Sequence, residues 1–357
     1  MESLSVKNAP ANFASDNIAP VAPEIMDAIV SANAGHAPPY GADDVSVGLG
    51  HAFADLFETD VAVFPVATGT AANVLSLAML TPPYGAIYCH ENAHIEEDEC
   101  GAPEFYTGAK LVPLPGEHGR LAAADLAEKL DGLAIGFEHH VQPAAISLTQ
   151  ATESGTSYRS DDIAAIAEVA KRFDLGLHMD GARFANSVAY LGCAPADVTW
   201  RAGVDVLSFG ATKNGGLAAE AAIFFQPELA ETFKYRCKRG GHLFSKMRYL
   251  SAQLEAYVKD DRWLRYASHA NAMAQHLAVG LAAVPGIEIV HPVEANEVFS
   301  SVPEPIIAGL AAQGFGFHRW GGGTSQILRL VTAFNTTTDE VVAFVTTASH
   351  FASEVVE

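Results

Sequence analysis

Short apolar runs alternate with amphipathic segments along the middle of the chain, from residue 61 to about residue 226. The apolar runs lack the regular polar alternation of a half-exposed strand, so they predict strands that are covered on both faces. Such strands, interleaved with helical patterns, are typical of an α/β protein with a mainly parallel sheet flanked by helices. Ser160 or Asp161 is the expected N-cap of the last of these helices. Strands are expected at 61–67, 86–89, 110–114, 144–150, 175–180, 204–210 and 221–226, and helices are expected to begin near residues 69, 122 and 160.

The pattern changes after residue 258. A long helix at about 259–284 is expected to lead into strands at 287–290, 297–302 and 327–334, with helices between and after them. This arrangement predicts a smaller α+β unit. We therefore divide the chain into residues 1–257, a lead segment with the large domain, and residues 258–357, a small C-terminal domain.

The composition argues against several classes of function. The 357 residues are 49% hydrophobic, which suffices for a large core, and they carry a formal net charge of −21. A chain this acidic is unsuited to binding nucleic acid or an anionic membrane, so a small-molecule substrate is expected. The four cysteines form no Cys-x-x-Cys pair, and the N-terminus lacks an apolar signal core. No apolar run reaches the roughly 18 residues that a membrane helix needs, and a cytoplasmic protein with free thiols is expected.

The stretch "HENAH" at 90–94 matches the zinc-protease pattern His-Glu-x-x-His. On a helix, His90 and His94 would share one face and could bind Zn²⁺, with Glu91 as general base and Glu117 as a candidate third ligand. The five residues directly follow an apolar run, however, so His90 is expected at the end of a strand. A zinc hydrolase therefore stays a distant alternative, and no metal site is expected.

Polar residues follow several of the expected strands, and parallel strands place such residues at one crevice. Thr68, Gly69 and Thr70 open a helix, where backbone N–H groups suit a phosphate. Asp180 ends an apolar strand, where a carboxylate needs a partner such as a protonated ring nitrogen. Lys213 follows a strand among small residues, and an accessible lysine of this kind forms Schiff bases. Taken singly, each feature also fits a cap, a turn or a loop residue, but in this order they describe a site for pyridoxal 5'-phosphate (PLP).

Six segments together resemble the low-specificity L-threonine aldolases, which are PLP enzymes of the aspartate aminotransferase fold. The resemblance runs from about residue 12 to the C-terminus. It implies the PLP-dependent transferase-like fold (fold type I), with a mainly parallel sheet and a smaller C-terminal α+β domain. The segments are "FASDN" (13–17), "ATGTAAN" (67–73), "HIEEDECGA" (94–102), "HMDGARFANS" (178–187), "SFGATKNGG" (208–216) and "LRLVTAF" (328–334).

The resemblance implies roles for the residues at the cofactor. Lys213 is expected to form the Schiff base with PLP, and Asp180 is expected to keep the pyridine nitrogen protonated. Gly69 and Thr70 are implied to bind the phosphate. His94 is implied to stack on the ring, so the second histidine of "HENAH" would face a cofactor rather than a metal.

The resemblance also implies residues at the substrate. Ser15, Arg183 and Arg329 are expected to bind the substrate carboxylate, since the fork of an arginine pairs with both oxygens. Tyr40 resembles a tyrosine at the edge of the family's active site. The basic, glycine-rich loop at 235–248 resembles one that reaches the phosphate of a neighbouring subunit, and Lys246 is the residue favoured there.

The identity of the base stays open between three histidines. His94 is one candidate, and the family's second histidine aligns with the doublet His139-His140, of which we favour His140. An unperturbed imidazole pKa of about 6.5 suits such proton transfer.

The reaction implied is retro-aldol cleavage of L-threonine, L-allo-threonine and related β-hydroxy-α-amino acids to glycine and an aldehyde. The resemblance further implies a homo-oligomer, a tetramer built from catalytic dimers, with sites completed across a subunit interface. The nearest alternatives are a β-eliminating lyase, an aminotransferase or a decarboxylase on the same fold.

Overall fold

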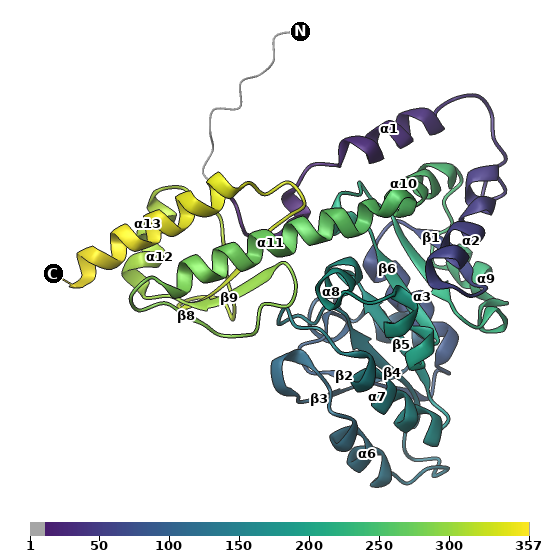
Figure 1. Cartoon of the computed structure of the whole chain (residues 1–357). Coiled ribbons are helices and arrows are strands. Elements are labelled where there is room, and N and C mark those ends of the chain that lie inside the picture. The colour runs from purple at the N-terminus through teal and green to yellow at the C-terminus, as the bar shows by residue number, and fades with distance from the viewer. Residues whose placement is uncertain (1–10, 357) are drawn as a thin grey trace.

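The computed structural model describes residues 11–356 and contains two sheets connected by a long helix (Figure 1). A seven-stranded sheet lies in the larger part of the molecule, and a four-stranded sheet lies in the smaller part near the C-terminus. Helix α11 (Arg262–Ala282) runs from one part to the other. The expected α/β fold with a smaller α+β part is confirmed.

The large sheet has the strand order β1-β7-β6-β5-β4-β2-β3. Neighbouring strands are parallel except at β7, which runs antiparallel to both β1 and β6. Strands β2, β6 and β7 are buried along their whole length, which explains why their sequences are apolar without alternation. The strands are β1 (Ala62–Val66), β2 (Gly85–His90), β3 (Lys110–Leu114), β4 (Gln142–Thr149), β5 (Gly176–Gly181), β6 (Val206–Gly210) and β7 (Glu220–Phe224).

Helices cover both faces of this sheet. Helices α3 and α9 pack with one apolar cluster, and α2, α6, α7, α8 and α10 pack with a second cluster that contains the aromatic core. The helices are α1 (Pro23–Ala32), α2 (Asp44–Phe57), α3 (Gly69–Leu80), α4 (His94–Glu97), α5 (Ala102–Thr107), α6 (Ala123–Asp131), α7 (Ser160–Arg172), α8 (Phe184–Leu191), α9 (Phe233–Arg239), α10 (Arg248–Val258), α12 (Glu304–Ala312) and α13 (Thr338–Val356).

One local expectation is wrong. The N-cap of α7 is Arg159 rather than Ser160 or Asp161. The backbone N–H of Arg159 donates to the carboxylate of Asp162 at 3.0 Å, so the acid three residues later secures the start of the helix.

The small part is an antiparallel sheet in the order β10-β11-β9-β8, packed against α11, α12 and α13. The lead segment joins this part, because Phe13 belongs to its apolar core and exchanges backbone hydrogen bonds with Gly316 and Val331, each at 2.8 Å. The strands of the large sheet all precede residue 258 and those of the small sheet all follow it, while the first described residues pack with the small sheet. Its strands are β8 (Glu288–Ile289), β9 (Glu297–Ser301), β10 (His318–Arg319) and β11 (Ile327–Val331).

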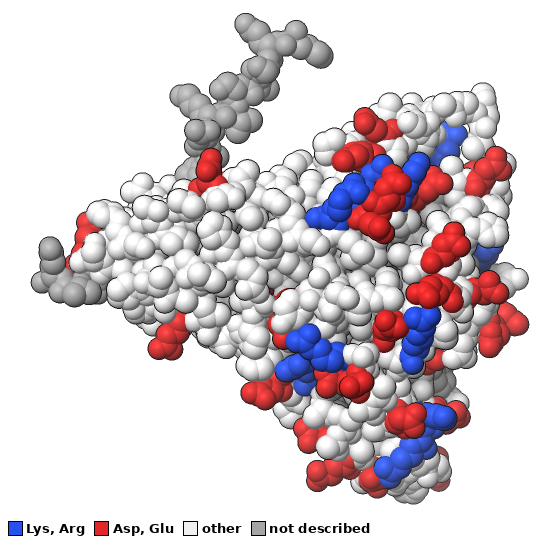
Figure 2. Space-filling view, viewed as in Figure 1, with Lys and Arg blue, Asp and Glu red and all other residues white. Residues whose placement is uncertain are grey.

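The surface is unevenly charged. On the face shown in Figure 2, acidic and basic side chains are intermixed over the large part, whereas the C-terminal part bears few. Within the range 11–356, the structure contains no helix that is both long and apolar enough to span a membrane.

Candidate active site

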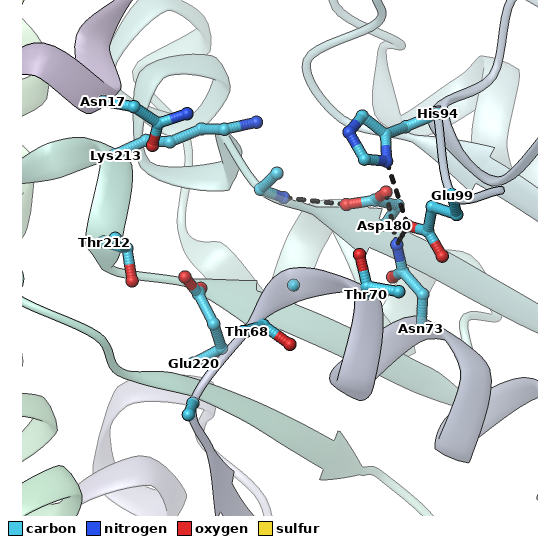
Figure 3. A pocket seen from close by; sticks show the side chains of 13 residues that line it. Asn17, Thr68, Thr70, Asn73, His94, Glu99, Asp180, Thr212, Lys213 and Glu220 are labelled. Atoms are coloured by element: carbon cyan, nitrogen blue, oxygen red, sulfur yellow. Dashed lines mark hydrogen bonds and ion pairs between the residues drawn. The ribbon is translucent and has the colours of Figure 1, made fainter. Parts of the chain in front are cut away.

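A pocket lies at the carboxyl ends of β1, β5 and β6, each of which leads into a turn or helix (Figure 3). Its walls come from segments that are far apart in sequence, and they meet because parallel strands end at one edge of the sheet. The structure thus brings Gly69, Thr70, His94, Asp180 and Lys213 together, as the order of strands and polar residues predicts. The pocket is lined by Asn17, Ala67, Thr68, Gly69, Thr70, Asn73, His94, Glu99, Asp180, Ala182, Thr212, Lys213 and Glu220.

The carboxylate of Asp180 is buried and held in one orientation. Its Oδ2 accepts a hydrogen bond from Asn73 Nδ2 at 2.8 Å, and its Oδ1 accepts one from the backbone N–H of Ala182 at 3.0 Å. Both partners are neutral donors, so the negative charge of the carboxylate is not cancelled by an arginine or lysine. A protonated ring nitrogen in the pocket would supply that missing positive partner.

His94 begins the short helix α4 and is tied to the same network. Its Nδ1 lies 3.0 Å from Glu99 Oε1, and the same oxygen accepts from Asn73 Nδ2 at 2.9 Å. The hydrogen bond to Glu99 raises the pKa of His94 above its ordinary value, against the opposing effect of burial. Asp180 raises it further through its charge, whereas the direct contact of the imidazole is with Glu99.

The N-terminus of α3 opens into the pocket beside Thr68. The Thr68 hydroxyl caps the helix by accepting from Ala71 N–H at 3.1 Å, and the first backbone N–H groups of the helix have no carbonyl of the same helix to bind. A Cβ atom at Gly69 would meet no heavy atom within 4 Å, so there is room beside the helix end. Backbone donors, the helix dipole and the Thr70 hydroxyl suit a phosphate here.

A tightly anchored turn presents Lys213. The lysine lies in the 3₁₀ turn η5 (Thr212–Asn214), whose Asn214 Nδ2 donates to Tyr257 Oη at 2.7 Å and to the Trp263 carbonyl at 2.9 Å. The turn ends at Gly215 with φ of 103°, a backbone conformation that other residues rarely adopt. In Figure 3, Lys213 and His94 project from opposite sides of the view.

The structure adds pocket residues that sequence reasoning missed: Asn17, Asn73, Glu99 and Glu220. Asn73 follows Gly69 by one helical turn, so its place on the same helix face was a usable signal. Glu220 is buried on β7 and accepts the Ala211 N–H at 3.0 Å. Burial raises the pKa of Glu220 to about 7, although hydrogen bonds from Thr212 and Ala211 and the charge of Lys213 lower it.

Arg183 lies near the pocket but already has two acidic partners. Its Nε and Nη2 donate to Asp16 at 2.8 and 3.1 Å, and its Nη1 lies 3.3 Å from Glu297 Oε1. Its side chain is only 5% exposed, and it is absent from the residues that line the pocket. In this structure the guanidinium of Arg183 is bound to two acids of its own chain. It is therefore not free to make the direct contact with a substrate carboxylate that the sequence led us to expect.

Two other expected substrate residues lie on the segments around Arg183. Ser15 caps the 3₁₀ turn η1 (Asp16–Ile18) by accepting the Asn17 N–H at 3.2 Å. Arg329 lies on β11, and its guanidinium stacks 5.2 Å from the ring centre of Trp320. The Nε of Arg329 is buried without a hydrogen-bond partner among the described residues, so this arginine retains an unused donor.

His140 does not meet His94 within one chain, which corrects the favoured choice of base. Gln142 at the start of β4 pairs with Gly85 at the start of β2, so the exposed His139-His140 doublet lies at the amino ends of the strands. Thr149, which pairs with Asp180 beside the pocket, lies at the opposite end of β4. Seven residues of extended chain span about 23 Å, so the sheet itself separates the doublet from the pocket.

The segment "HENAH" is not a helix. His90 ends β2, as its apolar approach predicts; its Nε2 lies 3.0 Å from the Gly116 carbonyl, and its Nδ1 accepts the Asn92 N–H at 3.0 Å. Both ring nitrogens therefore have backbone partners, and the face that a zinc protease needs is not formed. In the part of the chain that the structure describes, no group of three His, Cys, Asp or Glu side chains is arranged to hold a metal ion.

Tyr40 and Lys246 lie outside the pocket of their own chain. The N–H of Tyr40 donates to the carbonyl of Ser245 at 3.0 Å, and its ring lies 5.2 Å from Lys238 Nζ. Tyr40 and Lys246 are both exposed, and the segment around Tyr40 contacts the basic segment at 235–248, whose first residues, up to Arg239, lie on helix α9 rather than in a loop.

Known proteins resemble this chain over most of its length. The sequence model of the beta-eliminating lyase family matches residues 12–305. The low specificity L-threonine aldolase of Pseudomonas aeruginosa is 49% identical to it, over 87% of this chain and 89% of that protein. That of Pseudomonas sp. is 47% identical, over 88% and 91% of the two chains. The chain belongs to the low-specificity L-threonine aldolases of the beta-eliminating lyase family.

Solved structures agree with this membership. A threonine aldolase from Leishmania major superposes with a TM-score of 0.90 at 29% identity, covering 96% of this L-threonine aldolase family member and 100% of that chain. An aspartate aminotransferase from Rhodobacter sphaeroides superposes with a TM-score of 0.70 at 16% identity, over 99% and 95% of the two chains, and shows the shared fold. The family and the fold-type I architecture expected from sequence are confirmed.

Proposed function

We propose that this protein is a PLP-dependent carbon–carbon lyase that cleaves L-threonine, L-allo-threonine and related β-hydroxy-α-amino acids to glycine and an aldehyde. The observation that carries the proposal is one pocket in which Lys213, the buried Asp180 carboxylate and the start of α3 converge, with His94 opposite Lys213. The family to which the chain belongs supplies the class of reaction.

The residues present fit PLP. The start of α3, with Gly69 and Thr70, would hold the phosphate, and Lys213 would hold the aldehyde carbon as a Schiff base. Asp180, which has only neutral hydrogen-bond donors, would face the pyridine nitrogen. When bound, PLP draws electrons away from the substrate Cα and so stabilises the negative charge left there when the Cα–Cβ bond breaks.

His94 is the base that the geometry favours. Its Nδ1 is bonded to Glu99, so Nε2 is the nitrogen that accepts the proton of the substrate β-hydroxyl. Glu99 holds the ring in place and stabilises the imidazolium that forms. Asp180 keeps a proton on the atom that it faces, because an ionised carboxylate favours the protonated form of a nearby nitrogen.

The substrate carboxylate is expected beyond the Asn17 side of the pocket, toward Ser15 and Arg329, which do not themselves line the pocket. Arg329 has an unused buried Nε donor, whereas Arg183 is paired with Asp16 and Glu297. We therefore assign the direct contact to Arg329 and propose that Arg183 joins it only when its acidic partners release part of its fork.

The assembly and compartment follow as further parts of the proposal. We propose a homotetramer of catalytic dimers in which Tyr40 and the basic loop at 235–248, including Lys246, complete a neighbouring site. Their shared exposed surface supports this, as does their position outside the pocket of their own chain. We propose the cytoplasm as the compartment, because all four cysteines are unpaired thiols.

Product analysis tests the proposal. Purified protein loaded with PLP is incubated with L-threonine, and the products are identified by NMR. Glycine with acetaldehyde supports the aldolase; 2-oxobutanoate with ammonia indicates β-elimination, and a keto acid formed only with an amino acceptor indicates an aminotransferase. Absence of glycine and acetaldehyde would overturn the proposed function.

A further inference from the structure

Glu297 is an acid buried without hydrogen-bond donors. It begins β9, is 1% exposed, and neither of its carboxylate oxygens has a hydrogen-bond partner among the described residues. Its nearest cation is Arg183, whose Nη1 lies 3.3 Å from Oε1. A buried carboxylate with so little compensation is costly when ionised. An acid kept at that cost beside a substrate site is a candidate for a functional role.

The position of Glu297 links it to both arginines expected at the substrate. Glu297 pairs with Val331 across the β9–β11 ladder, and Phe299 pairs with Arg329. Because strand side chains alternate, Glu297 and Arg329 share one face of the small sheet as diagonal neighbours. The other face carries Val298, Leu328 and Leu330 into the apolar core. From the shared face, Glu297 reaches across to Arg183 of the large part.

The charges around Glu297 are already unbalanced. Arg183 and Arg329 are the cations that act on it, whereas Asp16 and Glu153 add negative charge. Burial raises the pKa of Glu297 to about 7; Arg183 and Arg329 lower it, and Glu153 and Asp16 raise it. With Glu297 ionised, these three acids outnumber the two arginines that act on it, and Lys213, the further cation beside Asp16, would be occupied by PLP in the loaded enzyme.

We propose that Glu297 takes up one proton from solvent when the substrate carboxylate binds, and thereby releases Arg183 Nη1 to share the carboxylate with Arg329. The inference rests on the proposed function, since it assumes an α-carboxylate at this place. The incoming charge replaces the charge of Glu297, so the number of anions beside the two arginines stays constant. Glu297 is a positioning residue in this scheme, because it acts on the substrate through Arg183 and forms no bond to it.

The proposal fixes the sign of a pH effect. An anion that enters beside Glu297 favours its protonated form, so binding is strongest where Glu297 is already protonated. Affinity for a carboxylate should be constant at low pH and fall as pH rises through the pKa of Glu297, by up to about tenfold per pH unit. A residue that only held Arg183 in place would leave no such slope.

The test uses the PLP-loaded enzyme and 3-hydroxybutyrate, a carboxylate that lacks an amine and so avoids proton release from amine chemistry. Its inhibition constant against L-threonine cleavage is measured from about pH 5.5 to about pH 8.5. The wild type should show the slope, and Glu297→Gln, which mimics the protonated acid, should bind with the low-pH affinity throughout. Glu294→Gln is the matched control, since Glu294 also bridges the two parts, through Ser157 N–H at 2.8 Å and Arg159 at 3.1 Å, without being paired with Arg183.

Calorimetry of 3-hydroxybutyrate binding to the wild type, in buffers of different ionisation enthalpy, keeps the proposal testable if Glu297→Gln fails to fold. Near pH 7 the wild type should take up a substantial fraction of one proton. No uptake, or a wild-type slope retained in Glu297→Gln, would overturn the inference. Failure of the proposed function is distinguishable, because it would show as a wild type that forms no glycine and acetaldehyde.

Discussion

His94 Nδ1 lies 3.0 Å from Glu99 Oε1, and that single oxygen also accepts a hydrogen bond from Asn73. The second oxygen of Glu99 is buried without a partner among residues 11–356. Glu99 thus directs its charge to His94, fixes the orientation of the ring and raises its pKa. Glu99 is therefore the main influence on the pH at which His94, the first residue of α4, gains or loses its proton.

Glu99→Gln should move the pH profile of cleavage to lower pH. His94 acts as a base only when neutral, so wild-type activity should rise as pH rises through the pKa of His94. Removing the charge of Glu99 removes the main cause that raises this pKa, and the rising limb should shift toward acid. The kcat of L-threonine cleavage as a function of pH measures this. Glu97→Gln, an exposed neighbour, should keep the wild-type limb; an unshifted limb in Glu99→Gln would remove Glu99 from this role.

Lys213→Ala should abolish covalent attachment of the cofactor and lower turnover by at least about 1,000-fold, because the amine is the nucleophile in the site. Borohydride reduction of the PLP-loaded wild type, followed by peptide mapping, should label Lys213. Lys234→Ala, on the exposed face of α9, should retain label and activity. Label on another lysine of the wild type would refute the assignment.

Asp180→Asn should keep the fold and lower kcat by about 100-fold or more, since a neutral amide cannot hold a proton on the cofactor's ring nitrogen. The variant keeps the size of the side chain, so the contacts with Asn73 and Ala182 change least. Steady-state kinetics with L-threonine, together with bound PLP from absorbance, separates lost chemistry from lost binding. Asp161→Asn on the surface of α7 is the control, and wild-type turnover in Asp180→Asn would contradict the role.

Asp16→Asn should destabilise the fold by about 3–5 kcal/mol, because it leaves the buried Arg183 with Glu297 as its only acidic partner. Burial alone would raise the pKa of Asp16, but the charge and hydrogen bonds of Arg183, the charge of Lys213 and a hydrogen bond from Asn296 hold it below its ordinary value. A depressed pKa contributes stability above the unfolded value that is lost as pH falls through the folded one. Urea denaturation should therefore show a weaker acid dependence in Asp16→Asn; equal free energies of unfolding in variant and wild type would disprove the contribution.

Cleavage should require the L configuration at Cα and tolerate both configurations at Cβ. The carboxylate site and the Lys213 side of the pocket define the handedness of Cα, whereas His94 is the base that the structure offers to the β-hydroxyl. A preference of only about 1.4 kcal/mol would still amount to a tenfold ratio between the epimers. Separate assays of L-threonine, L-allo-threonine and both D isomers measure this. Comparable cleavage of a D isomer would refute the carboxylate geometry, and strict rejection of one L epimer would indicate a more rigid hydroxyl site.

The sequence by itself determined the strands of the large sheet, each to within two residues at either end. It also determined that Thr68 and Lys213 follow strands and that Asp180 lies at the end of one, and so the edge of the sheet at which they meet. These properties are local: a strand buried on both faces must be apolar along its length, and a parallel strand can present a polar residue to a site only at its end.

Only the tertiary structure decided which of these side chains are free to act. Arg183 and Arg329 look equally suited to a carboxylate in the sequence, but Asp16 and Glu297 come from distant segments to occupy Arg183. The sequence leaves His94 and His140 as candidate bases and favours His140, but the two lie at opposite ends of the sheet. The partner of a charged group is set by packing between segments far apart in the chain, because a buried charge must be compensated by whatever the fold places beside it.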